Sequence, residues 1–273
     1  MESKKKIFIH SAITPIQPCF SEDIETSSLF VPRSFIHDQL WHPSKLGKID
    51  LIEKEIIDTN SENTLLSVGT TLTHFFSSVE KFNSRSRWQG DRIRKMFSTL
   101  SETHDITLVY YMFPAFESMK AIYADYISSR NNDVPTQEKF ENFCKTESHK
   151  ICHHKNVSSW KTVRGIDNII VRPFVDGPSL TSKYFKDVFS TIGVSPPRRA
   201  VFEIAERSAG MQEMTITESI AASFNDVYED NLRLCEEHLE KKDKQLFLET
   251  FYPYHGDFKP GISFKKIFGF LSS

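Results

Sequence analysis

The period of apolar and polar positions changes most clearly within residues 105–130. Residues 106–111 (ITLVYY) form a short β-branched and aromatic run between polar neighbours, which predicts a strand buried on both faces. From Pro114 to Ile127 apolar residues recur every three or four positions, which predicts a helix. A strand that leads directly into a helix is half of a βαβ unit. Because ligands of open α/β sheets bind at the carboxyl edge of the strands, we expect a site near residues 111–114.

The same patterns predict elements along most of the chain. Buried strands are expected at residues 6–10, 64–68 and 168–174, the last of which is stopped by Pro173. Amphipathic periods predict helices at residues 34–41, 49–58, 91–100, 184–192 and 218–241, with a further helical stretch that ends at residue 82. Thr136 is a candidate N-cap, and Gly193 is expected to end the helix before it. The pattern therefore favours an α/β three-layer sandwich around a mainly parallel sheet.

Composition narrows the class of protein. The chain has 273 residues and no Pro/Gly/Ser-rich linker, so we expect a single domain over residues 1–273. Its 34 Lys plus Arg and 36 Asp plus Glu give a net charge of −2, which predicts no general attraction to nucleic acid or to anionic membranes. The cysteines are scattered without a Cys-x-x-Cys pair, which favours a reducing, cytoplasmic location. No apolar run approaches the roughly 20 residues of a membrane span, and residues 7–9 are too short for the core of a signal peptide.

Four short segments occur in an informative order. They are IFIH at residues 7–10, VYY at residues 109–111 with Ala121 and Tyr123 after it, IIVRPF at residues 169–174 leading to YFKDVFSTIGV, and NLRLCEEH at residues 231–238. Together they resemble the bacterial sulfotransferase-like family. The similarity covers most of the chain, although each motif is short. The resemblance implies a P-loop-type α/β fold that transfers sulfonate from the donor PAPS to hydroxyls or amines of glycans and small molecules.

The chain departs from this family at the donor site. The family's first loop carries a Lys-Thr-Gly-Thr-Thr-like motif that holds the 5′-phosphosulfate, whereas residues 10–17 here are shorter and lack both Lys and Gly. Ser11 and Thr14 are left as candidate phosphate contacts. The family's Arg and Ser for the 3′-phosphate correspond to Phe113 and Ala121. Each lost charge-assisted hydrogen bond removes about 1.5–3 kcal/mol of binding free energy, so donor affinity would fall by orders of magnitude unless other residues compensate.

Other cations are candidate substitutes for the missing donor contacts. Lys120 lies in the predicted helix that follows the central strand. Arg85 and Arg87 begin a basic stretch that continues to Lys95, and its plain interpretation is a solvated helix face. The sequence does not place these cations relative to the donor.

The remaining candidate site residues each allow two interpretations. His10 ends the first predicted strand and allows two interpretations. It is either a catalytic base or a hydrogen-bond donor to phosphate, or it is a histidine at a strand end whose hydrogen bonds are satisfied within the protein. Thr70 and Thr71, with His74 a turn later, follow another strand and either meet an anionic substrate or cap a helix. Arg172 ends the strand IIVRPF and either points into the cleft toward substrate or pairs with a nearby carboxylate.

Two further clusters are interpreted without a functional role. His149, Cys152, His153 and His154 lie close together, but their spacing matches no usual zinc pattern, so we expect a solvated helix end and no metal site. Residues 255–260 (HGDFKP) resemble the catalytic loop of aminoglycoside-type phosphotransferases. Because no Asp follows to bind a metal, we interpret that segment as a turn.

Three functional hypotheses follow. The first is a sulfotransferase-like enzyme that binds PAPS near residues 10–14, with a glycan or small molecule as acceptor and catalysis mainly by positioning and charge stabilisation. The second is an inactive relative that keeps the fold as a binding or regulatory module. The third is a glycosyltransferase-like enzyme with a sugar-nucleotide donor. Measuring which donor binds would distinguish these three hypotheses. The sequence does not determine the oligomeric state.

Overall fold

The computed structural model describes residues 4–13, 24–32, 47–68, 84–128, 134–174, 181–196 and 213–251. Its strands are β1 (Lys5–Ala12), β2 (Ile24–Glu25), β3 (Phe30–Val31), β4 (Asn63–Val68), β5 (His104–Met112) and β6 (Ile166–Pro173). Its helices are α1 (Gly47–Asp58), α3 (Ser84–Leu100), α4 (Ala115–Ser128), α5 (Gln137–Glu147), the short 3₁₀ helix η5 (Ser148–Ile151), α6 (His153–Lys161), α7 (Thr181–Ile192), α8 (Glu218–His238) and α9 (Lys241–Phe251). The expectation of an α/β protein is confirmed.

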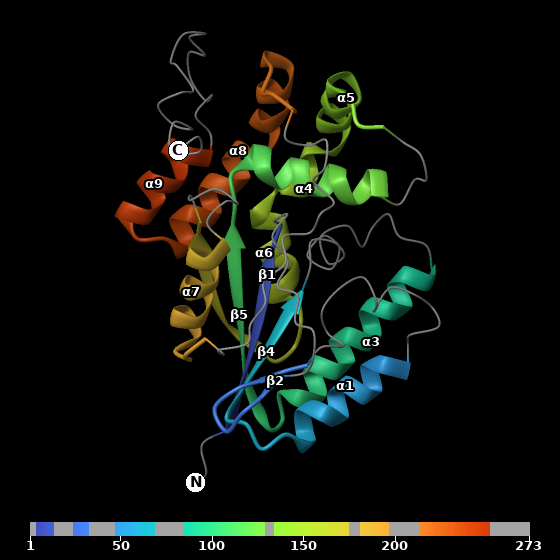
Figure 1. The fold of residues 1–273 in the computed structure, drawn as a ribbon, viewed down its shortest axis with the longest axis vertical. Coiled ribbons are helices and arrows are strands. Elements are labelled where there is room, and N and C mark those ends of the chain that lie inside the picture. Colours follow the sequence, from blue (N-terminus) through green and yellow to red (C-terminus); the bar gives the residue numbers. More distant parts are fainter. Residues whose placement is uncertain are drawn as a thin grey trace.

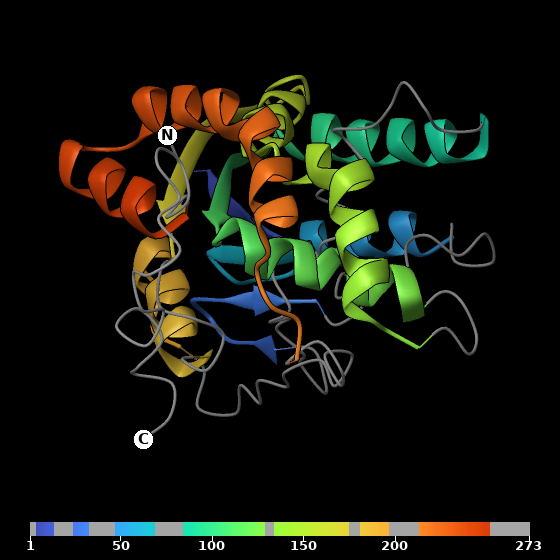
Figure 2. The same cartoon turned by 90° about the horizontal axis from the view of Figure 1, so that it is seen from above.

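The strands form one six-stranded sheet in the order β2-β3-β4-β1-β5-β6 (Figure 1). Five described strands, β3, β4, β1, β5 and β6, run parallel to one another. The described strand β2 at the edge pairs with β3 in antiparallel orientation. The first long strand of the chain, β1, therefore lies in the middle of the sheet between β4 and β5. Parallel strands need crossover connections, and the described crossover helices α1, α3 and α4 to α6 pack on one face of this sheet, whereas α7 covers the other face (Figure 2).

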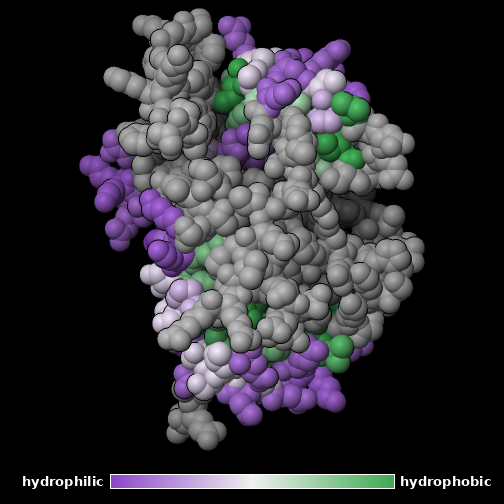
Figure 3. Space-filling view, viewed as in Figure 1, coloured by the Kyte–Doolittle hydropathy of each residue, from purple (hydrophilic) through white to green (hydrophobic). Residues whose placement is uncertain are grey.

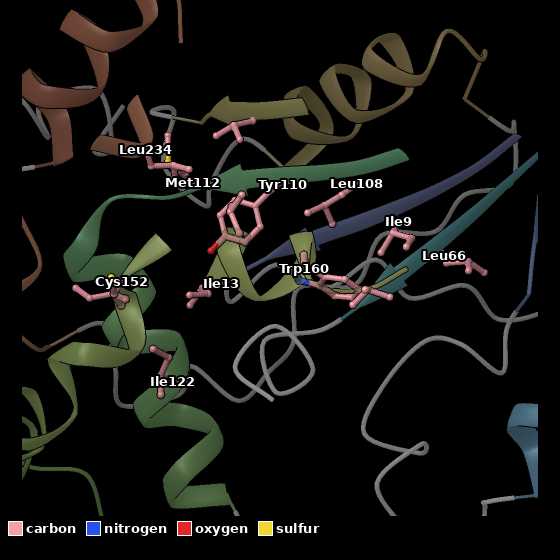
Figure 4. Packing of buried hydrophobic residues seen from close by; sticks show 14 of the residues in the cluster. Ile9, Ile13, Leu66, Leu108, Tyr110, Met112, Ile122, Cys152, Trp160 and Leu234 are labelled. Carbon is pink, nitrogen blue, oxygen red and sulfur yellow. The ribbon is translucent and has the colours of Figure 1, made fainter. Parts of the chain in front are cut away.

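Side chains alternate between two hydrophobic cores because successive residues of a strand point to opposite faces. Ile7 and Ile9 of β1 enter the larger core, to which α1, α3, α4, α5, α6 and α8 contribute. Figure 4 shows Ile9 and Leu108 of neighbouring strands directed toward Trp160 of α6. Phe8 of β1 enters the smaller core, which packs against α7. Both faces of the central strands are buried, which explains their continuous apolar runs.

Most predicted elements are confirmed with small changes in their ends. The strands expected at residues 6–10, 64–68, 106–111 and 168–174 are β1, β4, β5 and β6. The Thr136 hydroxyl accepts a hydrogen bond from the backbone N–H of Lys139, so Thr136 is the N-cap of α5 as predicted. Gly193, with φ of 71°, follows α7 in the left-handed conformation that ends many helices. The helix expected at residues 91–100 begins earlier, at Ser84.

Other expectations were wrong or fall outside the described residues. Residues 218–241 are mostly helical as expected, but they belong to two helices, because Leu239 adopts an extended backbone and ends α8. The solvated helix end expected around residues 149–154 is wrong for Cys152 and His153, whose exposed fractions are 0% and 1%. The helix expected at residues 34–41, the helical stretch expected to end at residue 82 and the turn at residues 255–260 lie outside the described residues.

The surface seen in Figure 3 is hydrophilic around the amino ends of the strands and along the margin where Figure 1 places α7 and α9. These are the outer faces of amphipathic helices and the turns that join them, where polar side chains meet water. Among the helices that the structure describes, none is long and apolar enough to span a membrane.

Candidate active site at the carboxyl edge of the sheet

The chain leaves β1 and β5 in opposite directions, and in open α/β sheets the ligand crevice lies between the carboxyl ends of two such strands. We call this position the crevice. After β1 the chain continues to β2 and β3 on one side of the sheet, whereas after β5 it continues to β6 on the other side. Ala12 of β1 lies in register with Tyr111 of β5, so both strands end at the same level. Open α/β sheets bind ligands at such a switch point. Residues 111–114, near which the sequence predicts a site, lie at this edge.

His10 is fixed beneath this edge by hydrogen bonds at both ring nitrogens. Its Nδ1 atom lies 2.9 Å from Oγ of Ser67 on β4, and its Nε2 atom shares a hydrogen bond with the hydroxyl of Tyr184 on α7. Its exposed fraction is 2%. Burial lowers the pKa of His10 to about 4, so the imidazole is neutral at ordinary pH. This geometry favours the satisfied histidine over the catalytic base, because neither nitrogen is free to take a proton from a substrate.

A second polar group lies beside His10 on the same face. The hydroxyl of Tyr111 donates a 2.6 Å hydrogen bond to Oδ2 of Asp187 on α7 and lies 3.2 Å from Oγ1 of Thr191. Arg172 of β6 donates from Nη2 to the other oxygen, Oδ1 of Asp187, at 2.8 Å. Tyr111 and Arg172 are register partners on adjacent strands. The pairing of Arg172 with a nearby carboxylate, one of its two predicted interpretations, is therefore what the structure shows.

The hydrogen bonds of His10 and those of Tyr111 and Arg172 both involve α7, because α7 presents a polar stripe to the sheet. Tyr184, Asp187 and Thr191 follow spacings of three and four residues, which places them on one side of a helix. Tyr184 also packs against aromatic rings, with ring centroids 5.1 Å from Phe113 and 4.9 Å from Phe174. Burial raises the pKa of Tyr184 well above its usual value, so its hydroxyl keeps its proton. Hydrogen-bonded polar side chains thus lie within an otherwise apolar interface.

The opposite face of the same strand ends holds a separate network. The Tyr110 hydroxyl lies 2.9 Å from Nδ1 of His153, and Asn156 donates to that hydroxyl at 3.3 Å. Burial lowers the pKa of His153 to about 3, and a hydrogen bond to the backbone of Phe113 opposes the shift. The Ser118 hydroxyl of α4 donates to the carbonyl of Ile13 at 3.1 Å and thereby ties the end of β1 to α4. The crevice is therefore held rigidly from this face as well.

The structure places only some of the predicted contacts to the donor. Ser11 is buried near the end of β1. The Lys120 ammonium pairs with Glu117 at 2.8 Å and lies over the ring of Phe116, so its charge is already balanced within α4. Arg85 and Arg87 lie in the first turns of α3, but the description does not extend to their side chains.

Thr14, Thr70, Thr71 and His74 lie outside the described residues, and their predicted roles stay predictions. Two further arginines of the basic stretch contact acidic partners. Arg92 forms an ion pair with Asp50 of α1, and Arg94 lies 3.5 Å from Asp91.

The residues that sequence reasoning missed are the partners supplied by α7 and β4. Asp187, Tyr184, Thr191 and Ser67 belong to elements that were predicted, yet none was singled out as a site residue. The available signal was the polar stripe in α7, where a Tyr, an Asp and a Thr share one side of an amphipathic helix. Its contacts with Arg172 and His10 arise only when the sheet and α7 pack together.

No group of three or more metal-ligating side chains occurs among the described residues. Cys152 donates a long hydrogen bond to Asp230, and burial raises the pKa of its thiol to about 11, which keeps it protonated. The described residues at this edge include neutral hydrogen-bonding groups, such as His10 and Tyr111, and the cation Arg172, which pairs with Asp187. A comparison of the chain with protein-family models, with curated proteins and with solved structures found no match.

Proposed function

We propose that this protein is sulfotransferase-like and that it binds PAPS at the carboxyl ends of β1 and β5. Sulfonate would pass from there to a hydroxyl or amine of a glycan or small molecule. The observation that carries the proposal is the position of β1, which lies centrally between β4 and β5 and ends at the switch point of a mostly parallel sheet. The loop that the resemblance assigns to the donor follows this strand directly. The P-loop-type fold is part of the same proposal.

In the proposed reaction, an acceptor oxygen or nitrogen forms a bond to sulfur while the bond from sulfur to the donor's phosphate oxygen breaks. PAP leaves with the electron pair, and the acceptor loses its proton to a base. Catalysis then consists mainly of alignment and of stabilising negative charge on the transferring group. His10 supports this site by holding the ends of β1, β4 and α7 together through its two hydrogen bonds.

A second candidate function is an inactive relative that binds a ligand without transferring a group. The observation that favours it is the pairing of both described cations predicted to contact ligand. Lys120 is balanced by Glu117, and Arg172 by Asp187. A highly charged donor would then depend on cations outside these two pairs, such as Arg85 or Arg87.

Calorimetric titration with PAP, the product of the donor, tests the proposal. We expect micromolar binding, and we expect that Thr14→Val weakens it by about tenfold because the hydroxyl of Thr14 is predicted to bond to phosphate. Thr146→Val is the matched control, since Thr146 is exposed on α5 and is not among the predicted donor contacts. Absence of binding at millimolar PAP would contradict the proposal.

Further ligands separate the alternatives. Binding of PAP without transfer of labelled sulfonate from PAPS to any acceptor in a panel of sugars and amines would favour the inactive relative. Selective binding of a sugar nucleotide in place of PAP would instead favour the glycosyltransferase-like hypothesis. Sulfonate transfer that stops when PAP is added in excess would support the proposed enzyme.

A further inference from the structure

Arg172 is a charged residue held at the carboxyl edge of the sheet. It lies near the end of β6, level with Tyr111 and therefore one strand away from the crevice between β1 and β5. Its side chain is 41% exposed. Burial alone would lower the pKa of Arg172, but the hydrogen bond and the charge of Asp187 outweigh burial and raise it, so the guanidinium stays protonated. A fixed positive group thus lies beside the candidate site.

The position of the guanidinium is set by partners on two other elements. Nη2 donates to Oδ1 of Asp187 at 2.8 Å, and Oδ2 of the same carboxylate accepts from the Tyr111 hydroxyl at 2.6 Å. Both carboxylate oxygens therefore have donors. Asp187 cannot rotate away from Arg172 without also breaking its hydrogen bond with the Tyr111 hydroxyl. Such doubly held carboxylates keep an arginine in one orientation, which is the preorganisation that a binding site needs.

One buried donor of this guanidinium, Nε of Arg172, has no hydrogen-bond partner among the described residues. A buried N–H without an acceptor is unfavourable, and most such groups in folded proteins meet a partner, a water or a ligand. We propose that Nε of Arg172 binds an oxyanion, a sulfate, phosphate or carboxylate group, and that Asp187 and Tyr111 are positioning residues that hold the guanidinium for it.

The surrounding charge predicts how this site discriminates among ligands. Asp187 pairs with Arg172, and Asp243 of α9 adds a second negative charge near the guanidinium. Net attraction for a bare anion is therefore small, and the directed N–H···O bond supplies the selectivity. We expect weak, millimolar binding of a free ion and tighter binding of an oxyanion that belongs to a larger molecule seated in the crevice.

This inference rests on the proposed function only for the source of the oxyanion. A phosphate of a nucleotide donor and the carboxylate of an acidic sugar acceptor share the required chemistry, so the experiment has one arm for each. The probes are inorganic sulfate, PAP and glucuronate. The readout is the nitrogen–hydrogen signal of Arg172 Nε in NMR spectra of the whole wild-type chain, assigned through its backbone.

We expect one or more of these probes to shift the Arg172 Nε–H signal in a saturable way. Arg172→Gln should reduce the affinity for that probe by at least about tenfold, because it removes a charge-assisted hydrogen bond. Arg233→Gln is the matched control, since it removes the same charge from an exposed position of α8 and should leave affinity unchanged. Thermal unfolding of both variants checks that each is folded.

The two proposals can fail separately. If PAP binds but the Arg172 Nε–H signal stays unchanged with every probe, the buried nitrogen holds water only, and this inference is overturned while the proposed donor binding stands. If sulfate or glucuronate shifts the signal and PAP does not bind, the oxyanion site is supported and the donor assignment fails. Because the signal is read in the wild-type chain, the test does not depend on whether Arg172→Gln folds.

Discussion

At the scale of single residues, the most informative groups are two buried histidines at the carboxyl ends of the central strands. His10 faces α7 and His153 belongs to α6 on the other face, and each is hydrogen-bonded through its ring. Burial lowers their pKa values to about 4 and about 3, because a charged imidazolium would lose its hydration. Both side chains therefore hold the strand ends as neutral hydrogen-bonding groups.

These pKa shifts predict loss of stability in acid. As pH falls from the ordinary histidine pKa of 6.5 toward 4, the unfolded chain binds protons at both positions while the folded chain does not. The free energy of unfolding should therefore decrease across this window, with His10 alone contributing on the order of 3 kcal/mol when the window is crossed fully. Urea unfolding at a series of pH values measures it.

His10→Gln provides the control for this prediction. A glutamine amide can still meet Ser67 and Tyr184, but it does not titrate, so the variant should lose part of the pH dependence and keep the part due to His153. An unchanged dependence of unfolding free energy on pH in His10→Gln would contradict the assignment of a depressed pKa to His10.

At the scale of elements, hydrophobic period predicted the strands and most helices, whereas contacts between elements were not predictable from it. The runs at residues 64–68 and 106–111 had to be strands buried on both faces because they are continuously apolar and too short for helices. The two-residue strands β2 and β3 were missed because two residues carry no period. The segment of η5 and α6 was expected to be solvated because its histidines are polar. His153 is nevertheless buried, because the hydroxyl of Tyr110 satisfies its ring nitrogen within the core.

The turn between α6 and β6 supports a second prediction. Gly165 has φ of 94°, and a Cβ atom added there would lie 2.3 Å from Cβ of Ser101 at the end of α3. Gly165→Ala should therefore lower the free energy of unfolding through both backbone strain and a collision that forces α3 and β6 apart. Left-handed strain alone contributes about 1–2 kcal/mol, so the total should exceed this range.

Gly193→Ala is the matched control for the turn. Gly193 also has positive φ, of 71°, but a Cβ atom added there meets nothing within 4 Å. It should show the strain without the collision. Urea unfolding that gave equal losses for the two variants would mean that the contact between Gly165 and Ser101 does not constrain the packing of α3.

At the scale of the whole molecule, one core links elements from both ends of the described chain. The larger hydrophobic cluster includes Ile7 of β1, Trp160 of α6 and Phe247 of α9, together with side chains of the central strands. Elements that share a core unfold together, which supports the prediction of a single domain. Scanning calorimetry should show one transition, with the calorimetric enthalpy equal to the van't Hoff enthalpy. Two resolved transitions would contradict a single cooperative unit.

The sequence by itself determined the class of fold and the edge of the sheet at which to look for a site. Buried strands alternating with amphipathic helices leave an α/β sheet as the arrangement that covers both faces, and the carboxyl ends of its strands must share one edge. His10 and Arg172 could be named as candidates because each ends a predicted strand.

Only the tertiary structure decided what these candidates contact. Side chains of β1, β5 and β6 meet the polar stripe of α7 because the strand order and the packing of α7 bring together residues far apart in the chain. The pairing of Arg172 with Asp187, the hydrogen bonds at both nitrogens of His10 and the unpaired Nε of Arg172 depend on that packing. A linear pattern records which face a residue occupies, but the partner on that face is set by the neighbouring element.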